Sequence, residues 1–146
     1  MKLVIQRVKS ASVSVAGELV SSIQSGLLVL VGVADTDTDQ DLDYAVRKCV
    51  NLRIFNDDNG VMNRSVIDTC GDVLAVSQFT LLAATRKGNR PSYIHAAGHD
   101  LAVPMYDAFC DKVSELIGRE VQKGIFGADM QVSLVNDGPV TIIIDS

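Results

Sequence analysis

A glycine-proline pair near the C-terminus is the feature that most constrains how this chain can fold. Gly138 and Pro139 separate two runs of alternating apolar residues, 130–134 and 140–144, and each run predicts a strand. Proline fixes its own φ and has no amide donor, whereas glycine accepts backbone geometry that other residues avoid. The pair therefore predicts a rigid corner that presents backbone carbonyls to a ligand. The alternative is an ordinary Asp-Gly hairpin turn at residues 137–138.

A second segment, Ser-Gln-Phe-Thr-Leu at residues 77–81, follows the apolar run of residues 73–76. It places two hydroxyls, an amide and an aromatic ring where a strand gives way to a loop. Polar groups at a strand end commonly face a site, because the rigid scaffold aims them. Thr80 is a candidate nucleophile, although an unactivated hydroxyl is a poor one at neutral pH. The alternative is that Ser77 and Thr80 are plain strand formers.

The two histidines are poor candidates for catalysis or for metal binding. Neither His95 nor His99 is close in sequence to Ser77 or Thr80, and there is no Gly-x-Ser-x-Gly elbow, so we expect no Ser-His-Asp triad. Their four-residue spacing suits a metal on a helix, but no cysteine or further histidine accompanies them. We expect the pair to face solvent beside a loop, and we expect no metal and no cofactor.

Length and composition fit one small soluble domain. A chain of 146 residues suits a single domain spanning residues 1–146. No apolar run approaches the roughly 20 residues of a membrane span, and the N-terminus lacks the apolar core of a signal peptide. Three cysteines form no Cys-x-x-Cys spacing, and Cys49 and Cys110 fall on apolar helix faces, so we expect buried thiols. A cytoplasmic location without membrane contact is the expectation.

Charge limits how much nucleic acid the chain can hold. Thirteen basic against eighteen acidic side chains give a net charge of −5, whereas a protein that grips a long duplex shows a strong basic field. Arg86, Lys87 and Arg90, however, gather just after the segment at 77–81. A few cations near a pocket suffice to hold a single-stranded end. The alternative is that these three side chains only solvate a loop.

The remaining pattern predicts several strands and two helices. Residues 2–15 alternate as a strand does, Ala16-Gly17 can turn the chain into a second strand at residues 18–20, and the apolar run 27–33 predicts a strand buried on both faces. Residues 56–60 predict a turn. The first helix, capped by Thr38 or Asp39, has an apolar face of Leu42, Ala45, Val46, Cys49 and Val50. The second has Met105, Tyr106, Phe109, Val113, Leu116 and Ile117 on one side, Pro104 near its first turn and Gly118 at its end. The fold class is α+β.

Together, the segments at 77–81 and 136–141 resemble the signature pair of the D-aminoacyl-tRNA deacylases. The resemblance continues through residues 5–8 (Ile-Gln-Arg-Val), 26–30 (Gly-Leu-Leu-Val-Leu), 53–55 (Arg-Ile-Phe), 88–92 (Gly-Asn-Arg-Pro-Ser) and 128–130 (Ala-Asp-Met). It implies a β-barrel-like sheet flanked by two helices, in a homodimer with active sites at the subunit interface.

The implied activity is hydrolysis of the ester bond of D-aminoacyl-tRNA, a chiral proofreading step in translation. The resemblance assigns catalysis to Ser77, Gln78, Phe79 and Thr80, substrate binding and chiral selection to Arg7, Phe126, Met130, Gly138 and Pro139, and tRNA binding to Arg86, Lys87 and Arg90. Plain core packing is the alternative for Phe126 and Met130. The 2′-hydroxyl of the tRNA is expected to help activate the attacking water.

In this family the Gly-Pro bond is cis and enters the active site of the partner subunit. Its carbonyls are expected to exclude L-side chains, so glycyl-tRNA should also be accepted. Two alternatives are a relative with a trans bond that acts on small L-aminoacyl-tRNA, and a non-catalytic dimer that binds nucleic acid. The intact Ser77-Gln78 pair argues against the first, and the net charge of −5 argues against general DNA binding.

Overall fold

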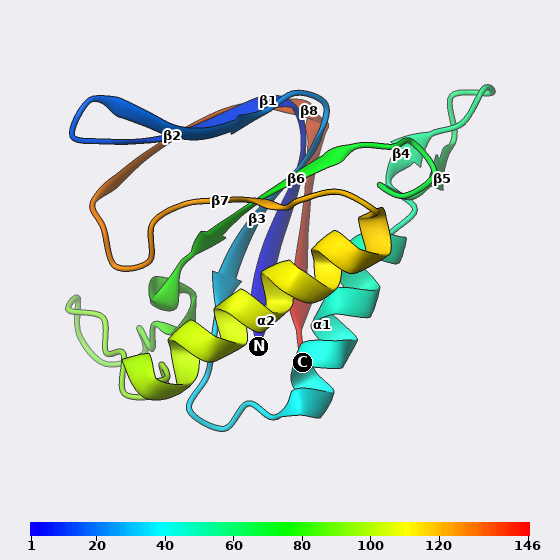
Figure 1. The fold of residues 1–146 in the computed structure, drawn as a ribbon. Helices are drawn as coiled ribbons and strands as arrows, with labels where there is room; N and C mark the ends of the chain where they lie inside the picture. Colours follow the sequence, from blue (N-terminus) through cyan, green and yellow to red (C-terminus); the bar gives the residue numbers. More distant parts are fainter.

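The long first strand organises the sheet of the computed structural model, which describes residues 1–146 (Figure 1). β1 (Lys2–Val15) pairs antiparallel with β8 (Met130–Asp145) along one edge, and its other edge is shared by β3 (Gly26–Gly32) and β2 (Glu18–Ile23). β3 continues in parallel to β6 (Asp72–Ser77), and β6 to the short β7 (Gln122–Lys123). The sheet curves into the barrel-like form that was predicted.

The corner at Gly138-Pro139 is a bulge inside β8. Gln6 of β1 pairs with Thr141 and Val8 pairs with Asn136, so Arg7 alone faces residues 137–140. Both halves of β8 remain paired with the same strand, and the alternative of a hairpin turn at residues 137–138 is therefore wrong. The Gly138-Pro139 bond is cis, as the resemblance implied, and Gly138 has a φ of +147°.

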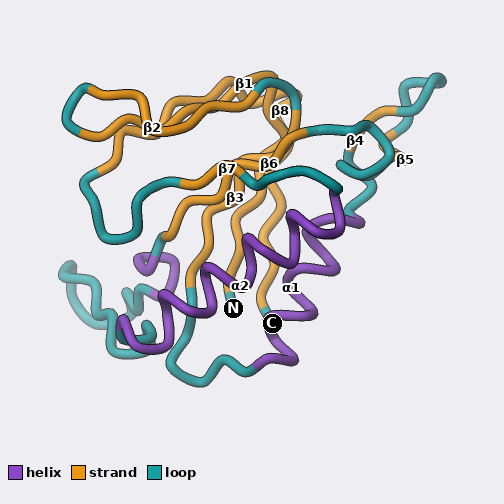
Figure 2. Tube along the Cα trace, viewed as in Figure 1, coloured by secondary structure: helices purple, strands orange, loops and turns teal.

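Two helices cover the outer face of the sheet, which confirms the predicted α+β class (Figure 2). α1 (Asp39–Asn51) begins after Thr38, whose amide and hydroxyl both donate to the Asp41 carboxylate. α2 (His99–Ile117) ends at Gly118, which has a left-handed φ of +70°. Neither helix is long and apolar enough to cross a membrane.

The two faces of the sheet bury separate cores. On the helix side, 26 buried residues pack together, and on the inner side of the curved sheet seven do, among them Val8, Val13 and Leu28. β3 contributes to both clusters, which confirms the prediction of a strand buried on both faces. Cys49 and Cys110 belong to the helix-side core, and their burial raises the pKa of each thiol to about 12.

The second helix corrects two expectations and excludes one alternative. Leu116 is 51% exposed and lies outside the apolar face, whereas Ile117 is buried. Pro104 is the sixth residue of α2, one turn later than expected, and it has no amide to give to the carbonyl of Asp100, an exposed residue. His95 precedes α2, so the two histidines share no helical face.

The remaining short elements connect these layers. β4 (Phe55–Asn56) and β5 (Met62–Arg64) form a small hairpin around the predicted turn at residues 56–60. A single 3₁₀ turn, η1 (Phe79–Leu82), follows β6 directly. In Figure 1 the β4-β5 hairpin lies at one end of the molecule and η1 with the start of α2 at the other.

Candidate active site

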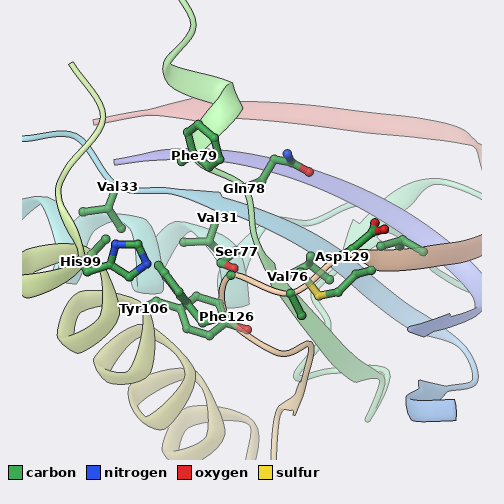
Figure 3. A pocket seen from close by; sticks show the side chains of 15 residues that line it. Val31, Val33, Val76, Ser77, Gln78, Phe79, His99, Tyr106, Phe126 and Asp129 are labelled. Atoms are coloured by element: carbon green, nitrogen blue, oxygen red, sulfur yellow. The ribbon is translucent and has the colours of Figure 1, made fainter. Parts of the chain in front are cut away.

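A cavity of about 420 Å³ opens where β3 and β6 end, between η1, the start of α2 and the segment that leads into β8 (Figure 3). Ten of its fifteen lining residues are hydrophobic. It is lined by Val31, Val33, Val76, Ser77, Gln78, Phe79, His99, Ala102, Tyr106, Phe126, Gly127, Ala128, Asp129, Met130 and Val132. A largely apolar hollow with a few polar groups at one strand end is typical of a small-molecule site.

The end of β6 supplies the polar groups. The Gln78 amide donates to the Val31 carbonyl at 2.7 Å, which carries the parallel β3-β6 pairing to the rim of the cavity. The Gln78 side-chain amide donates to the Thr80 hydroxyl at 2.5 Å. Figure 3 shows Ser77 between Phe79 on one side and the rings of Tyr106 and Phe126 on the other. Thr80 itself lies outside the lining.

A glycine in β3 makes room for η1 beside the cavity. A Cβ at Gly32 would lie 2.6 Å from Leu82 and 3.1 Å from the Gln78 carbonyl. Any side chain there would push η1 away from β3. Because Phe79 and Thr80 begin η1, the helix itself gives their amides no acceptor.

Three rings form the wall opposite η1. Phe126 makes edge contacts with His99, at 5.5 Å between ring centroids, and with Tyr106, at 5.9 Å. The Tyr106 hydroxyl donates to the Ala75 carbonyl at 2.9 Å. Burial raises the pKa of Tyr106, so its phenol stays neutral and remains a donor.

Met130 closes the cavity where β8 begins. Its sulfur would lie 2.6 Å from a Cβ at Gly124, so the glycine leaves space for this side chain. Met130 and Val132 also pack against the inner core of the sheet. Phe126 and Met130 therefore do both things considered for them: they pack against the core and they line the cavity.

Arg7, Gly138 and Pro139 do not line this cavity. Arg7 is 8% exposed; its Nε donates to the Asp137 carbonyl at 2.8 Å and its Nη1 to the Ile54 carbonyl at 2.6 Å. The Asp137 carboxylate lies 3.5 Å from Arg7 Nε. Arg7 thus anchors the corner to the chain just before β4, while Gly138 and Pro139 stay exposed.

Arg86, Lys87 and Arg90 lie in an exposed loop beside η1. Ala84 and Ser92 close this loop with two backbone hydrogen bonds, of 2.8 and 3.0 Å. All three cations are exposed, and none forms an ion pair. They are therefore available to a ligand that reaches the cavity.

Sequence reasoning missed much of the lining. Val31 and Val33 were assigned to a buried strand, Tyr106 to a helix core and His99 to solvent. His99 is exposed, as expected, and it borders the cavity as well. The others come to the cavity through the β3-β6 pairing and the packing of α2.

Known proteins are similar to this chain in both sequence and fold. The family profile described as D-Tyr-tRNA(Tyr) deacylase matches residues 4–145. The chain belongs to this family. Among deacylase relatives, D-aminoacyl-tRNA deacylases of Parabacteroides distasonis and Flavobacterium johnsoniae are 59% and 56% identical over 146 residues, which cover 100% of this chain and 97% of each relative.

Two solved structures resemble this D-Tyr-tRNA(Tyr) deacylase family member throughout. One is described as a c-Myc DNA unwinding element binding protein; it is 42% identical, with a TM-score of 0.95, over 100% of this chain and 99% of that one. The other, described as a probable eukaryotic D-amino acid tRNA deacylase, has a TM-score of 0.86 over 99% and 98% of the chains. At 19% identity it supports the fold alone.

Proposed function

We propose that this protein is an esterase that hydrolyses D-aminoacyl-tRNA to the free D-amino acid and tRNA, as a chiral proofreading step in translation. The observation that carries the proposal is the placement of Ser77, Gln78 and Phe79 at the rim of an apolar cavity of about 420 Å³, in a chain of this family. A cavity of this size accommodates an amino-acid side chain and its ester group.

In the proposed reaction, water attacks the ester carbonyl and the bond to the 3′-oxygen of the terminal adenosine breaks. The tRNA's 2′-hydroxyl helps to activate the water, and the departing 3′-oxygen takes up a proton. The amides of Phe79 and Thr80, which η1 leaves without an acceptor, stabilise the oxyanion. Gln78 holds the Thr80 hydroxyl, so Thr80 shapes the turn and does not attack the substrate.

Chiral selection requires a second copy of the chain. Gly138 and Pro139 are exposed and do not line the cavity of their own subunit, so they are free to enter the cavity of a partner. Apolar side chains that a partner would cover lie beside both regions, including Phe79 at 57% exposure and Val135 at 54%. In such a homodimer the rigid backbone at the corner fills the space that an L-side chain needs.

If the backbone excludes L-side chains, an ester without a side chain is a further substrate. Glycine has no Cβ to exclude, so glycyl-tRNA, correctly charged or mischarged, is accepted. Arg86, Lys87 and Arg90 hold the acceptor end of the tRNA beside the cavity. The proposed deacylation takes place in the cytoplasm, where aminoacyl-tRNA is made.

The deciding experiment compares amino-acid release from D-tyrosyl-, L-tyrosyl- and glycyl-tRNA. We expect fast release from the D- and glycyl esters and none above background from the L-ester. Equal release of D- and L-tyrosine would contradict exclusion by the corner. Release from L-alanyl-tRNA in preference to the D-esters would favour an opened pocket.

A second candidate is a dimer that binds DNA without catalysis, because the structure at 42% identity is described as a DNA unwinding element binding protein. The net charge of −5 opposes broad binding to a duplex. Fluorescence anisotropy with an AT-rich duplex and with an uncharged tRNA tests this candidate. Tight DNA binding without release from any ester would favour it.

A further inference from the structure

Six of the thirteen basic side chains are held in ion pairs with aspartates, and most of the others fall into two groups. One group is the loop of Arg86, Lys87 and Arg90, already given a role. The other, which we call the α1 cleft, consists of Arg47, Lys48 and Arg53 and has no role in the proposed reaction. Lys9 stands alone. The free positive charge of an acidic protein is therefore concentrated at two places.

The α1 cleft is a shaped surface. Its volume is about 370 Å³, and Asn51 and Leu52 complete its lining. Arg53 is held in place by a hydrogen bond of 3.0 Å from its Nε to the Asn63 carbonyl of β5, which leaves its outer N–H groups to a ligand. All three cations are exposed, and none has an acidic partner.

Helix chemistry explains only part of this arrangement. Cations in the last turn of a helix are stabilised by its dipole, which accounts for Lys48. Arg53 lies beyond the end of α1 and is oriented by a different element. Two guanidinium groups and an ammonium around one cleft suit the phosphates of a nucleic-acid backbone, since arginine binds phosphate through paired N–H groups.

The α1 cleft is joined to the corner by a short chain of contacts. Arg53 precedes Ile54, whose carbonyl accepts from Arg7, and Arg7 also donates to the Asp137 carbonyl beside Gly138. In Figure 1 the end of α1 and the β4-β5 hairpin lie opposite the end that carries η1. A cleft at the corner end of one subunit is therefore carried to the cavity of a partner whenever the corner enters it.

We propose that Arg47, Lys48 and Arg53 bind the sugar-phosphate backbone of a tRNA whose acceptor end occupies the partner subunit's cavity. This inference rests on the proposed function and adds a second RNA contact to it. Each bound acceptor arm then meets two groups of cations, the loop of Arg86, Lys87 and Arg90 from one subunit and the α1 cleft from the other.

The test is the double variant Arg47→Gln/Lys48→Gln beside Lys9→Gln/Lys112→Gln, which removes the same charge elsewhere. With D-tyrosyl-tRNA we expect KM to rise about tenfold in the cleft variant with kcat unchanged, and the dependence of kcat/KM on salt to become shallower. The control variant is expected to keep the wild-type KM and the wild-type dependence of kcat/KM on salt. With D-tyrosyl-adenosine, which has no phosphates, the two variants are expected to behave alike.

The outcomes separate this inference from the proposed function. If both double variants raise KM for D-tyrosyl-tRNA equally, the α1 cleft has no specific role, although deacylation stands. If the wild type releases nothing from either D-ester, the proposed function fails, and anisotropy with uncharged tRNA decides the α1 cleft by itself. If only the cleft variant binds uncharged tRNA more weakly, the proposed role of the α1 cleft is supported. If both variants bind it equally, that role is overturned.

Discussion

The two ends of this molecule are built in opposite ways. At the cavity end, β6 stops at Ser77 and leaves a hollow walled by aromatic rings. At the corner end, residues 137–140 bulge from β8, and Arg7 fixes them through the carbonyls of Asp137 and Ile54. The cavity end offers a hollow that fits a small ligand, whereas the corner end offers a fixed piece of backbone that lies outside that hollow. Under the proposed function, a complete site combines the two ends, one from each of two subunits.

The largest effect is expected when a methyl group is added at the corner. In Gly138→Ala the new Cβ would lie 2.7 Å from the Val140 side chain and 2.9 Å from the Val140 amide nitrogen, so the backbone must move. We expect D-tyrosyl-tRNA deacylation to fall about 100-fold, because a small misplacement of positioning groups has effects of this size. Gly17→Ala is the control: Gly17 also has a positive φ, of +80°, but nothing lies within 4 Å. Equal losses in the two variants would remove the corner's special role.

The anchor of the corner comes next. Arg7→Ala leaves the buried Ile54 carbonyl without its charged donor and frees residues 137–140, so we expect the free energy of unfolding to fall by about 3 kcal/mol. Arg119→Ala also removes contacts from a guanidinium to backbone carbonyls, of Cys70 and Gly71, but on the surface, and should cost about 1 kcal/mol. Urea denaturation measures both. Similar losses would mean that the corner is held by the sheet alone.

At the cavity end, Thr80→Ala is expected to slow deacylation less than tenfold. Its hydroxyl accepts from the Gln78 side chain, and the proposed oxyanion donors are backbone amides that the substitution preserves. Losing one hydrogen bond costs about 1 kcal/mol, which corresponds to less than a tenfold change in rate. Single-turnover rates with D-tyrosyl-tRNA provide the measurement. Complete loss of turnover would make Thr80 a nucleophile and would move the chemistry from the backbone to a side chain.

The smallest effect is expected in the aromatic wall. Tyr106→Phe removes a hydrogen bond to the Ala75 carbonyl, but that carbonyl still accepts from the Gly124 amide at 3.0 Å. The free energy of unfolding should fall by about 1 kcal/mol. Tyr93→Phe, at a residue that is 38% exposed, is the matched change and should be neutral. A loss of several kcal/mol in Tyr106→Phe would show that the cavity wall is as tightly anchored as the corner.

The elements of the fold could be predicted because their signals are local. Alternation marked residues 2–15, which form β1 with the same bounds, and a helical repeat marked the five buried residues of α1. Leu116 was misplaced because it adjoins Ile117 on the helix, and only the packing of α2 against the sheet decides which of the two is covered. Periodicity defines a face but not its edges.

The candidate site was less accessible from sequence, because its parts meet through long-range pairing. Val31 reaches the cavity since β3 runs parallel to β6, and the contact of Arg7 with the Ile54 carbonyl joins residues 47 positions apart. Neither relation leaves a local pattern. Ser77, Gln78 and Phe79 line one cavity, and Thr80 does not. The catalytic roles that the resemblance assigned to these four residues, and the selective roles of Gly138 and Pro139, stay predictions.

The bulge in β8 keeps residues 137–140 out of the pairing with β1. Because β1 pairs with Asn136 before the bulge and with Thr141 after it, the register of the sheet does not depend on what the loop between them contains. Under the proposed function, admitting a different class of side chain would call for rebuilding these four residues and not the strands around them.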